Sequence, residues 1–502
     1  MARRGGVRAE EAFDVVIVGG GAAGCVVAAR LSESGSRSVL LLEAGPDLRA
    51  SVPGELRDGW RIPGEFDWGY TSEPDARGVI EDLTRGRLLG GTSWMTRFAL
   101  RGSTADYDDW AALGNAGWRF EDVLPYFTRL ESDADFGGRP WHGDRGPMPV
   151  DRYLDVELTE IAAAGLEALQ AEDFAAVEDH NQPGAIGAGR MPMSSRAGIR
   201  VTTADAYLPL GSTPANLTIR TDSQVADVVL DGARARGVRL LDGAVIEADW
   251  VVVCAGTYGT PAILLRSGIG PAQHLRSVGV PVRLDLPGVG ANLADHGGVD
   301  IECGYRGPAR AAPILHIVAT FHSATASSDQ APDLMLWLSD PRGDPPIFEI
   351  DVVLLKPDSR GTVRLRTADP AQPPLVELPN LRESSDVERL AEGYRLALEV
   401  AHQPQIRRLC ADPPSPDIRA DNELPKMIRA ESYSFPHVVG TCSMGPRAED
   451  GAVVDACGHV HGTSRLSVID ASVVPNGPSG FTHFPTVMIA ERLSEELAAH
   501  LR

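Results

Sequence analysis

The stretch FDVVIVGGGAAG occupies residues 13–24, and the rest of the chain is organised around it. Its run 15–18 is short, β-branched and uninterrupted, which is typical of a buried parallel strand. Gly19, Gly21 and Gly24 follow with G-x-G-x-x-G spacing. The first glycine permits a tight turn, the second lets the backbone approach a pyrophosphate, and the third lets the next helix pack closely on the strand. The stretch therefore predicts the first turn of a dinucleotide-binding fold.

The residues that follow support this interpretation. A helix predicted over residues 22–34 begins with Ala22 and Ala23 and directs its N-terminal N–H groups at the phosphates. A second apolar run, 38–42, ends on Glu43. An acid about 20 residues after the glycines accepts hydrogen bonds from the ribose hydroxyls of an adenosine. The alternative is a plain glycine turn with a surface glutamate, and these residues do not distinguish FAD from NAD.

Length and charge limit the classes of protein. A chain of 502 residues with 43% hydrophobic residues predicts two to four globular domains. The formal net charge of −22 argues against nucleic acid or an anionic membrane as a partner, since the only basic cluster is Arg3-Arg4. No apolar run is long enough for a transmembrane segment, and the N-terminus lacks the apolar part of a signal peptide.

The cysteines and histidines predict no metal site. The six cysteines are scattered without CxxC spacing, and HExxH is absent. His459 and His461 share a strand-like stretch, but two imidazoles alone are a weak metal motif. Isolated thiols are typical of reduced core residues, so the sequence predicts a cytoplasmic protein.

A second glycine-rich stretch follows at residues 85–96, RGRLLGGTSWMT. Gly90 and Gly91 leave backbone N–H groups free, and Thr92 and Ser93 add hydroxyls. This composition suits a second phosphate contact, although a plain turn is the alternative.

Several stretches together resemble the glucose-methanol-choline (GMC) oxidoreductases, FAD enzymes that oxidise alcohols. RGRLLGGTSWMTRFALRG resembles the family's first signature, and GTYGTPAILLRSGIG resembles its second. The other matching stretches are 106–110, 114–118, 286–296, 361–370, 437–445, 468–472 and 485–491. Their order and spacing identify the chain as a member of this family, and its arginine-rich composition resembles that of the family's bacterial, actinobacterial branch.

The resemblance implies noncovalent FAD, because Met95 stands where some members attach the flavin through histidine. In relatives, the residue matching Val225 holds the adenine through its backbone, and the backbone beside Pro485 contacts the flavin pyrimidine. The predicted cofactor-binding residues are Gly19, Gly21, Ala22, Ala23, Gly24, Glu43, Arg87, Gly90, Gly91, Thr92, Val225, Asp470, His483, Pro485 and Thr486.

Alcohol oxidation needs a hydride acceptor and a base for the hydroxyl proton. Flavin N5 accepts the hydride, and a neutral imidazole suits the base at neutral pH. The sequence alone cannot choose among 12 histidines. The resemblance selects His437, which opens HVVGTCSMG and matches the general base of relatives.

Two residues depart from the family pattern. Phe481 stands where relatives carry a second histidine or asparagine, and His483 lies two residues on. His483 is therefore either a second catalytic side chain or part of the cofactor scaffold. Thr96 replaces the asparagine usual in the first signature, which puts the geometry near the flavin in doubt.

The expected fold is α/β, a Rossmann-like FAD-binding domain with a parallel sheet, interleaved with an α+β substrate domain built on an antiparallel sheet. The FAD-binding parts are 10–145, 201–297 and 431–502, and the last contains the histidine motif. The substrate-side parts are 146–200 and 298–430. Strands are expected at 317–321, 333–338, 348–355 and 362–366, and helices at 156–169, 386–402 and 486–501. A hairpin is expected between 237–240 and 244–248, across Asp242-Gly243.

The resemblance implies oxidation of a small-molecule alcohol to an aldehyde or ketone, with oxygen, a quinone or another redox carrier as electron acceptor. Two alternatives remain at this point. One is a non-oxidative lyase or photodecarboxylase on the same fold, which Phe481 keeps open. The other is a low-turnover flavoprotein partner in a redox-cofactor or biosynthetic system. Substrate identity is expected to depend on residues 57–82 and 300–350.

Overall fold

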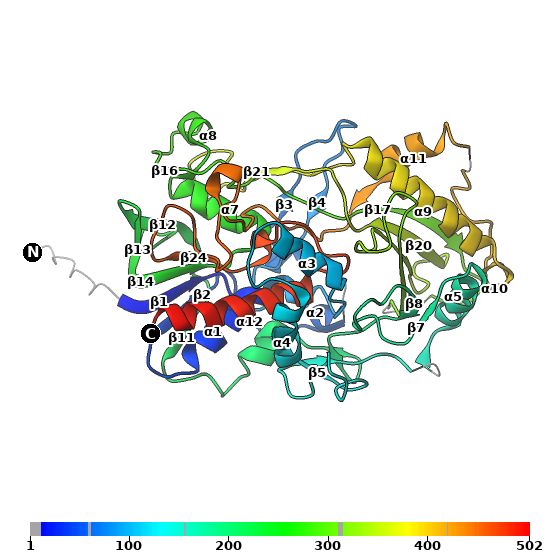
Figure 1. The fold of residues 1–502 in the computed structure, drawn as a ribbon, viewed down its shortest axis with the longest axis horizontal. Coiled ribbons are helices and arrows are strands. Elements are labelled where there is room, and N and C mark those ends of the chain that lie inside the picture. The colour runs from blue at the N-terminus through cyan, green and yellow to red at the C-terminus, as the bar shows by residue number, and fades with distance from the viewer. Residues whose placement is uncertain (1–11, 59–61, 155–156, 310–314, 419) are drawn as a thin grey trace, which may run out of the picture.

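Two seven-stranded sheets occupy opposite halves of the molecule along its long axis (Figure 1). The computed structural model describes residues 12–58, 62–154, 157–309, 315–418 and 420–502. Within these residues each sheet draws strands from distant parts of the chain, so the expected interleaving of an α/β and an antiparallel half is confirmed. The individual segment boundaries stay a prediction, and the start of the first segment at residue 10 lies outside the described residues.

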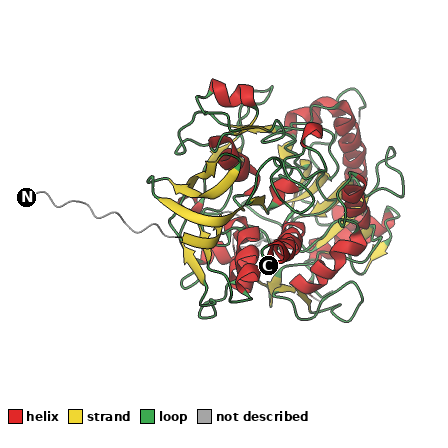
Figure 2. Cartoon of the chain, turned by 60° about the vertical axis from the view of Figure 1, so that its left-hand side comes forward, coloured by secondary structure: helices red, strands yellow, loops and turns green. Residues whose placement is uncertain are grey.

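The first sheet has the order β11-β2-β1-β14-β13-β12, with β24 also paired to β14. Its strands lie side by side at the left of Figure 2. β1, β2, β11, β14 and β24 are parallel, whereas β12 and β13 are antiparallel. The bounds are β1 Ala12–Val18, β2 Val39–Leu42, β11 Leu217–Arg220, β12 Val225–Asp231, β13 Arg234–Leu240, β14 Val245–Val253 and β24 Leu466–Val468.

The central strands of the first sheet have continuous apolar sequences because their side chains are buried. Residues 15–18 of β1 and 39–42 of β2 are buried, because helices cover the sheet. α1 (Ala22–Ser32) returns the chain from β1 to β2 and packs against α12 (His483–His500). α1 ends slightly earlier than predicted, and α12 begins at His483 rather than Thr486.

A buried carboxylate ties α12 to the elements around it. Glu491 is fully buried and accepts hydrogen bonds from Arg30, Arg129 and the Tyr207 hydroxyl, at 2.7, 2.7 and 2.6 Å. Arg30 belongs to α1 and Arg129 to α4 (Phe120–Leu130). The last helix is thereby fixed against the first, which sets the position of its N-terminus.

The predicted hairpin is confirmed, because Gly237 pairs with Glu247 and the Leu240 N–H donates to the Ala244 carbonyl at 2.8 Å. It returns the chain to the first sheet, where β14 lies beside β1.

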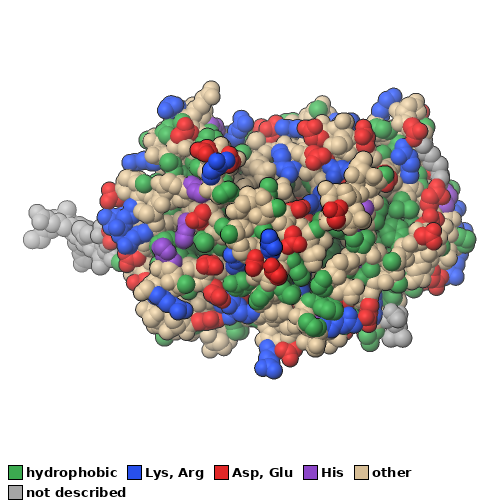
Figure 3. Space-filling view, in the orientation of Figure 1, with side chains coloured by type: hydrophobic (Ala, Val, Ile, Leu, Met, Phe, Trp, Pro, Cys, Tyr) green, Lys and Arg blue, Asp and Glu red, His purple; other side chains and the backbone are tan. Residues whose placement is uncertain are grey.

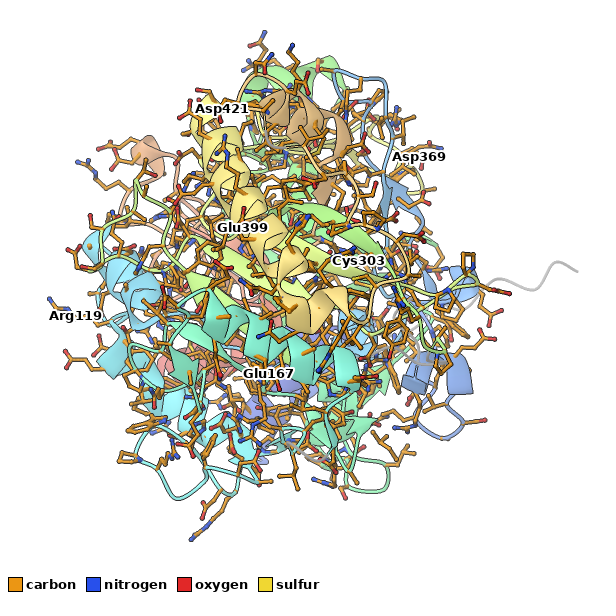
Figure 4. The ribbon with its side chains drawn as sticks, turned by 90° about the vertical axis from the view of Figure 1, so that its right-hand side faces the viewer. Arg119, Glu167, Cys303, Asp369, Glu399 and Asp421 are labelled. Carbon is orange, nitrogen blue, oxygen red and sulfur yellow. The ribbon has the colours of Figure 1, made fainter. Side chains whose placement is uncertain are left out.

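The second sheet has the order β23-β17-β20-β19-β18-β8-β7 and is antiparallel apart from the pair β7 and β8. Helices α5 and α9 pack on its outer face, and α10 packs against both of these helices. In Figure 4, α9 carries Glu399 and crosses in front of the strand that carries Cys303. The bounds are β7 Ala176–Val177, β8 Gly187–Arg190, β17 Gly297–Gly304, β18 Ile317–Phe321, β19 Leu334–Leu338, β20 Ile347–Leu354, β23 Tyr433–Ser434, α5 Glu160–Ala171, α9 Ser384–His402 and α10 Pro404–Arg407.

One predicted strand lies elsewhere. The run predicted at 362–366 forms β21 (Thr362–Arg364), which pairs with β22 (Leu375–Glu377) in a separate two-stranded sheet. The Val363 N–H donates to the Gly290 carbonyl at 2.7 Å, which holds β21 away from the large sheet. The helix expected from residue 156 begins at Glu160 as α5, and its predicted first residue lies outside the described ones.

The remaining elements are short connections around these two sheets. They are α2 Gly54–Asp58, β3 Tyr70–Thr71, β4 Asp82–Leu83, α3 Thr104–Ala112, β5 Glu131–Asp133, β6 Met148–Val150, β9 Ser195–Arg196, β10 Ile199–Arg200, α6 Thr203–Tyr207, α7 Gly256–Arg266, β15 Ile269–Gly270, α8 Ala272–Ser277, β16 Leu284–Asp285 and α11 Leu424–Glu431, with 3₁₀ turns η1 Gly64–Phe66, η2 Gly91–Trp94, η4 Ala448–Asp450 and η5 Ala471–Val473.

Charges of both signs are interspersed on the face shown in Figure 3. Among the described residues, no helix combines the length and apolar character needed to cross a membrane.

Candidate active site

A cavity of about 1160 Å³ extends from the carboxyl ends of β1 and β2 to the inner face of the second sheet. Ligands of open α/β sheets bind at this edge. Gly19 and Glu43 line one end, and Trp337 and Asp351 line the other, with His437 also in the wall.

The glycine turn behaves as its spacing predicts. Gly19 has φ +100°, and a Cβ there would lie 2.6 Å from the Cys254 carbonyl oxygen. A Cβ on Gly24 would lie 1.8 Å from the Gly19 carbonyl oxygen, so only glycine lets α1 pack this closely. Nothing lies within 4 Å of a Cβ on Gly21, which lines the cavity with Ala22. The backbone at the start of α1 is therefore open to an anionic group.

Glu43 is buried where β2 ends. Its Oε2 accepts from the Gly20 N–H at 2.8 Å, and its Oε1 accepts from the Gly45 N–H at 2.9 Å. Burial raises the pKa of Glu43 to about 7, against the lowering effect of these hydrogen bonds. A carboxylate has about four acceptor positions, so two remain for ribose hydroxyls.

The second glycine-rich stretch lies against the first. Gly90 has φ +97° and donates its N–H to the Gly20 carbonyl at 2.7 Å. A Cβ on Gly91 would lie 2.8 Å from Gly21 Cα, so the two loops meet backbone to backbone. Thr92 and Arg87 line the same part of the cavity, as a second phosphate contact requires.

Asp470 joins the C-terminal part of the chain to this site. Its Oδ2 accepts from the Gly256 N–H at 2.8 Å and from the Thr260 hydroxyl at 2.5 Å, at the start of α7. All but three of the predicted cofactor residues line the cavity. The three exceptions are Gly24, Gly90 and Pro485. A dinucleotide therefore fits the open glycine backbone, the two remaining acceptor positions of Glu43 and the elongated cavity.

His437 lies in the segment that follows β23. This segment runs antiparallel to residues 294–296, because the Phe435 N–H donates to the His296 carbonyl at 2.9 Å and the Val439 N–H donates to the Ala294 carbonyl at 3.0 Å. The pairing places His437 Nδ1 3.0 Å from His296 Nδ1. Burial lowers the pKa of His437 well below its usual value, and His296 and Arg85 lower it further. The imidazole of His437 is therefore neutral at pH 7.

The contact between the two rings restricts where their protons lie. Burial lowers the pKa of His296 to about 4, so this ring is neutral too. Two Nδ1 atoms 3.0 Å apart share one proton. The far nitrogen of His296, Nε2, is buried and has no hydrogen-bond partner among the described residues, so the contact itself allows either ring to supply the shared proton. In the tautomer with His437 Nδ1–H as the donor and His296 Nδ1 as the acceptor, His437 Nε2 carries a free lone pair, which is the arrangement that a base at His437 requires.

Asp295 fixes the backbone of His437. Its Oδ1 accepts from the His437 N–H at 2.7 Å, and its Oδ2 accepts from the Ser434 hydroxyl. Burial raises the pKa of Asp295 to about 7.

The wall around the His437 ring is aromatic. The Phe481 ring lies 4.8 Å from it and the Phe435 ring 5.1 Å, between centroids. Phe98 packs on Phe481 at 4.4 Å. Phe481 therefore lies beside His437 and makes its surroundings apolar.

His483 also lines the cavity but packs its ring on Phe484, at 5.8 Å. Its buried Nε2 has no hydrogen-bond partner among the described residues, and burial lowers its pKa to about 4. Thr96 and Met95 line the cavity as well, and the Thr96 hydroxyl accepts weakly from the Phe98 N–H at 3.4 Å.

Sequence reasoning missed four residues of this site. Asp295 and His296 end the stretch 286–296, which resembles a family motif, so their position in that motif was a usable signal. Trp337 and Asp351 lie on β19 and β20, in strands that carry no motif.

Comparisons with known proteins agree with this geometry. The GMC oxidoreductase family matches residues 13–297 with its N-terminal profile and residues 357–490 with its C-terminal profile. A GMC-type oxidoreductase of Rhodococcus erythropolis is 35% identical over 498 residues, covering 96% of this chain and 97% of the relative. A 5-(hydroxymethyl)furfural oxidase of a Methylovorus species is 34% identical over 530 residues, covering 97% and 98%.

The solved structures agree as well. Pyridoxine 4-oxidase from Mesorbium loti superposes with a TM-score of 0.90 and 29% identity, covering 97% of this chain and 99% of that one. The glycine turn and Glu43 lie in the range that matches the N-terminal profile, and His437 lies in the range that matches the C-terminal profile. The chain is a member of the GMC oxidoreductase family, an FAD-dependent oxidoreductase that acts on CH–OH groups.

Proposed function

We propose that this protein oxidises a small-molecule alcohol to an aldehyde or ketone, with His437 as the general base. The observation that carries the proposal is a buried, neutral His437 whose Nδ1 contacts His296 at 3.0 Å, in the wall of the cavity. FAD, when bound, would supply the hydride acceptor at N5.

The residues of the site accept the proton of the substrate hydroxyl and hold the base in position. With Nδ1–H donated to His296, the Nε2 lone pair of His437 accepts the proton of the substrate hydroxyl. The lowered pKa keeps this lone pair available at neutral pH, so the base needs no prior deprotonation. Asp295 holds the backbone of His437 in place during the transfer.

The aromatic rings keep water away from the reacting carbon. Phe481, Phe435 and Phe98 pack around the His437 side of the cavity. Exclusion of water strengthens electrostatic interactions inside the site and favours transfer to the cofactor over side reactions.

The residues at the other end of the cavity would hold FAD without a covalent bond. Glu43 would accept from the ribose hydroxyls, and the N–H groups at Gly21–Ala23 and Gly91–Thr92 would face the pyrophosphate. Met95 offers no nucleophile for a flavin bond.

We assign His483 to the cofactor side rather than to proton transfer. Phe481, not His483, packs on the His437 ring, and His483 lies with Thr486 in the first turn of α12. Its unpartnered Nε2 is then a hydrogen-bonding group for bound cofactor.

The electron acceptor is oxygen, a quinone or another redox carrier. Oxygen is favoured because two of the similar proteins are named oxidases. The six cysteines are all free thiols, which supports a cytoplasmic location.

Anaerobic mixing of the FAD-loaded protein with primary and secondary alcohols tests the proposal. Wild type should lose its visible flavin band, and His437→Asn should lose it roughly 100- to 10,000-fold more slowly. Equal rates would remove His437 from its role. If no alcohol bleaches the flavin, the result contradicts alcohol oxidation and supports the non-oxidative alternatives. Carbon–carbon cleavage of a substrate without flavin reduction would then identify a lyase or photodecarboxylase. Admission of air after bleaching then shows whether oxygen is the acceptor.

A further inference from the structure

Two cysteines meet on the outer side of the second sheet, away from the cavity. Cys303 lies near the end of β17, and Cys410 follows shortly after α10. Both belong to the apolar cluster between this sheet and its covering helices, and Figure 4 labels Cys303 on its strand behind α9. Neither of them lines the cavity, so the proposed reaction leaves both thiols unused.

Backbone pairing brings the two thiols together. The Ala411 N–H donates to the Gly304 carbonyl at 2.7 Å, and Tyr305 forms an antiparallel bridge with Cys410. Side chains two residues apart on a strand point to the same face. Cys303 therefore lies diagonally across from Cys410 on one face, and the two thiols interact with each other.

The surroundings of Cys410 favour its thiolate. As a thiol, its Sγ–H donates to the Ile406 carbonyl at 3.3 Å. A hydrogen bond from the Cys303 thiol lowers the pKa of Cys410; burial opposes this change, and the guanidinium groups of Arg407 and Arg306 add to it. The same hydrogen bond raises the pKa of Cys303, which therefore keeps its proton. The pair thus combines a nucleophilic sulfur with a neighbouring protonated thiol.

The other four cysteines lack this combination. All six cysteines belong to the described part of the chain. Burial raises the pKa of the thiols of Cys25, Cys254, Cys442 and Cys457, as is usual for inert core thiols. Cys410 is the thiol whose pKa is lowered. It is itself buried, but the next residues, 411–413, are exposed, so its sulfur lies directly beneath the surface.

We infer that Cys303 and Cys410 form a site of reversible oxidation, at which a hydroperoxide converts the two thiols into an intrachain disulfide. The Cys410 thiolate attacks one peroxide oxygen, the O–O bond breaks, and the alkoxide or hydroxide that leaves takes up a proton. The Cys303 sulfur then attacks the resulting sulfenic acid. The S–S bond forms as the S–O bond breaks, and water leaves with the proton of Cys303.

The two sulfurs together lose two electrons in these steps, and the peroxide gains them. The inference does not rest on alcohol oxidation, because the hydroperoxide can come from any source. It fits a protein whose cysteines are free thiols at rest, since disulfides of reducing compartments are mostly transient.

Peptide mapping after peroxide treatment tests the inference directly. The reduced, FAD-loaded protein is treated with hydrogen peroxide at neutral pH, alkylated under denaturing conditions and digested with trypsin. Arg306 and Arg408 lie between the two cysteines in the sequence, so trypsin places them on different peptides. A disulfide-linked pair of these peptides should appear, two of the six thiols should be lost, and dithiothreitol should restore both. If Cys303 and Cys410 both stay open to alkylation, or oxidise without becoming linked, the inference is overturned.

Single substitutions test the roles of the two sulfurs. In Cys303→Ala the sulfenic acid has no thiol to react with, so dimedone should label Cys410, roughly tenfold faster than it labels Cys457. In Cys410→Ala, Cys303 should stay reduced during the same exposure to peroxide. Cys457→Ala is the matched control, because it removes a partly exposed thiol outside the pair and should form the disulfide like wild type. Equal labelling of Cys410 and Cys457, or oxidation of Cys303 in Cys410→Ala, would overturn the inference, and the wild-type map decides it where a variant fails to fold.

Discussion

The two ends of the cavity are built in different ways. At the nucleotide end the wall is backbone, supplied by Gly19, Gly21 and Gly91, and its shape follows from residues close in sequence. At the substrate end the wall is side chains on β17, β19 and β20, brought together by strand pairing between residues far apart in the chain. The first end holds a constant group, and the second end is free to differ between relatives.

The buried carboxylates show the same difference. Glu43 and Asp470 accept backbone N–H groups within the protein. Asp351 accepts one tyrosine hydroxyl and faces Asp300. Burial raises the pKa of both Glu43 and Asp351 to about 7, and the two sites differ in their donors: Glu43 accepts two backbone N–H groups, whereas Asp351 accepts one side-chain hydroxyl.

The largest effect should come from the nucleotide end. Gly24→Val places a side chain where even a Cβ would lie 1.8 Å from the Gly19 carbonyl oxygen, so α1 cannot stay packed on the turn. The purified variant should carry almost no flavin, measured as visible absorbance per protein. Gly138→Val is the matched control, because nothing lies within 4 Å of a Cβ there. Full flavin content in Gly24→Val would contradict the role of this turn.

The next largest effect should come from the contact between His296 and His437. His296→Leu removes the acceptor of the His437 Nδ1–H and should slow anaerobic bleaching roughly 10- to 100-fold, with a changed pH profile. His296→Asn keeps a side-chain oxygen near the Nδ1 position and should restore much of the rate. A structural role alone would leave the pH profile unaltered, and equal loss in both variants would argue against the proposed tautomer.

At the substrate end the effect should appear in stability. The pKa of Asp351 is about 7 in the folded protein and near 3.8 in the unfolded chain. Between these values the folded state binds more protons, so this group makes the protein less stable as pH rises towards 7. Asp351→Asn should therefore raise the free energy of unfolding by roughly 1–3 kcal/mol at pH 8 and by little near pH 4. Denaturant unfolding at both pH values checks this, and a loss of stability at pH 8 would contradict it.

The smallest effect should come from His483→Ala. Removing one buried hydrogen-bonding group should raise the Kd for FAD about tenfold. The rate of bleaching in the FAD-saturated variant should fall less than the affinity does. A much larger loss of rate than of affinity would make His483 a catalytic residue.

The two ends also differ in how far the sequence alone predicts them. The turn at Gly19–Gly24 and the acid at Glu43 have fixed local spacing, so the nucleotide end was predicted residue by residue. His437 needed the family motif, because one histidine among 12 has no local signature. Asp351 and Trp337 could not be predicted, since only the register of β19 on β20 makes them neighbours.

The position beside the base shows the same limit. Sequence reasoning left Phe481 and His483 as alternatives, because a loop of unknown shape separates them from His437. The structure places the Phe481 ring 4.8 Å from His437 and turns His483 towards Phe484. Tertiary packing, not spacing, made that choice.

The central claim is that this protein removes a hydride from the carbinol carbon of an alcohol while His437 takes the hydroxyl proton. The most direct measurement is the anaerobic bleaching rate of wild type at saturating alcohol, with hydrogen or deuterium on the carbinol carbon. We predict bleaching that slows several-fold with deuterium, because that bond breaks in the observed step. Bleaching at the same rate with either isotope, or no bleaching, would contradict the account.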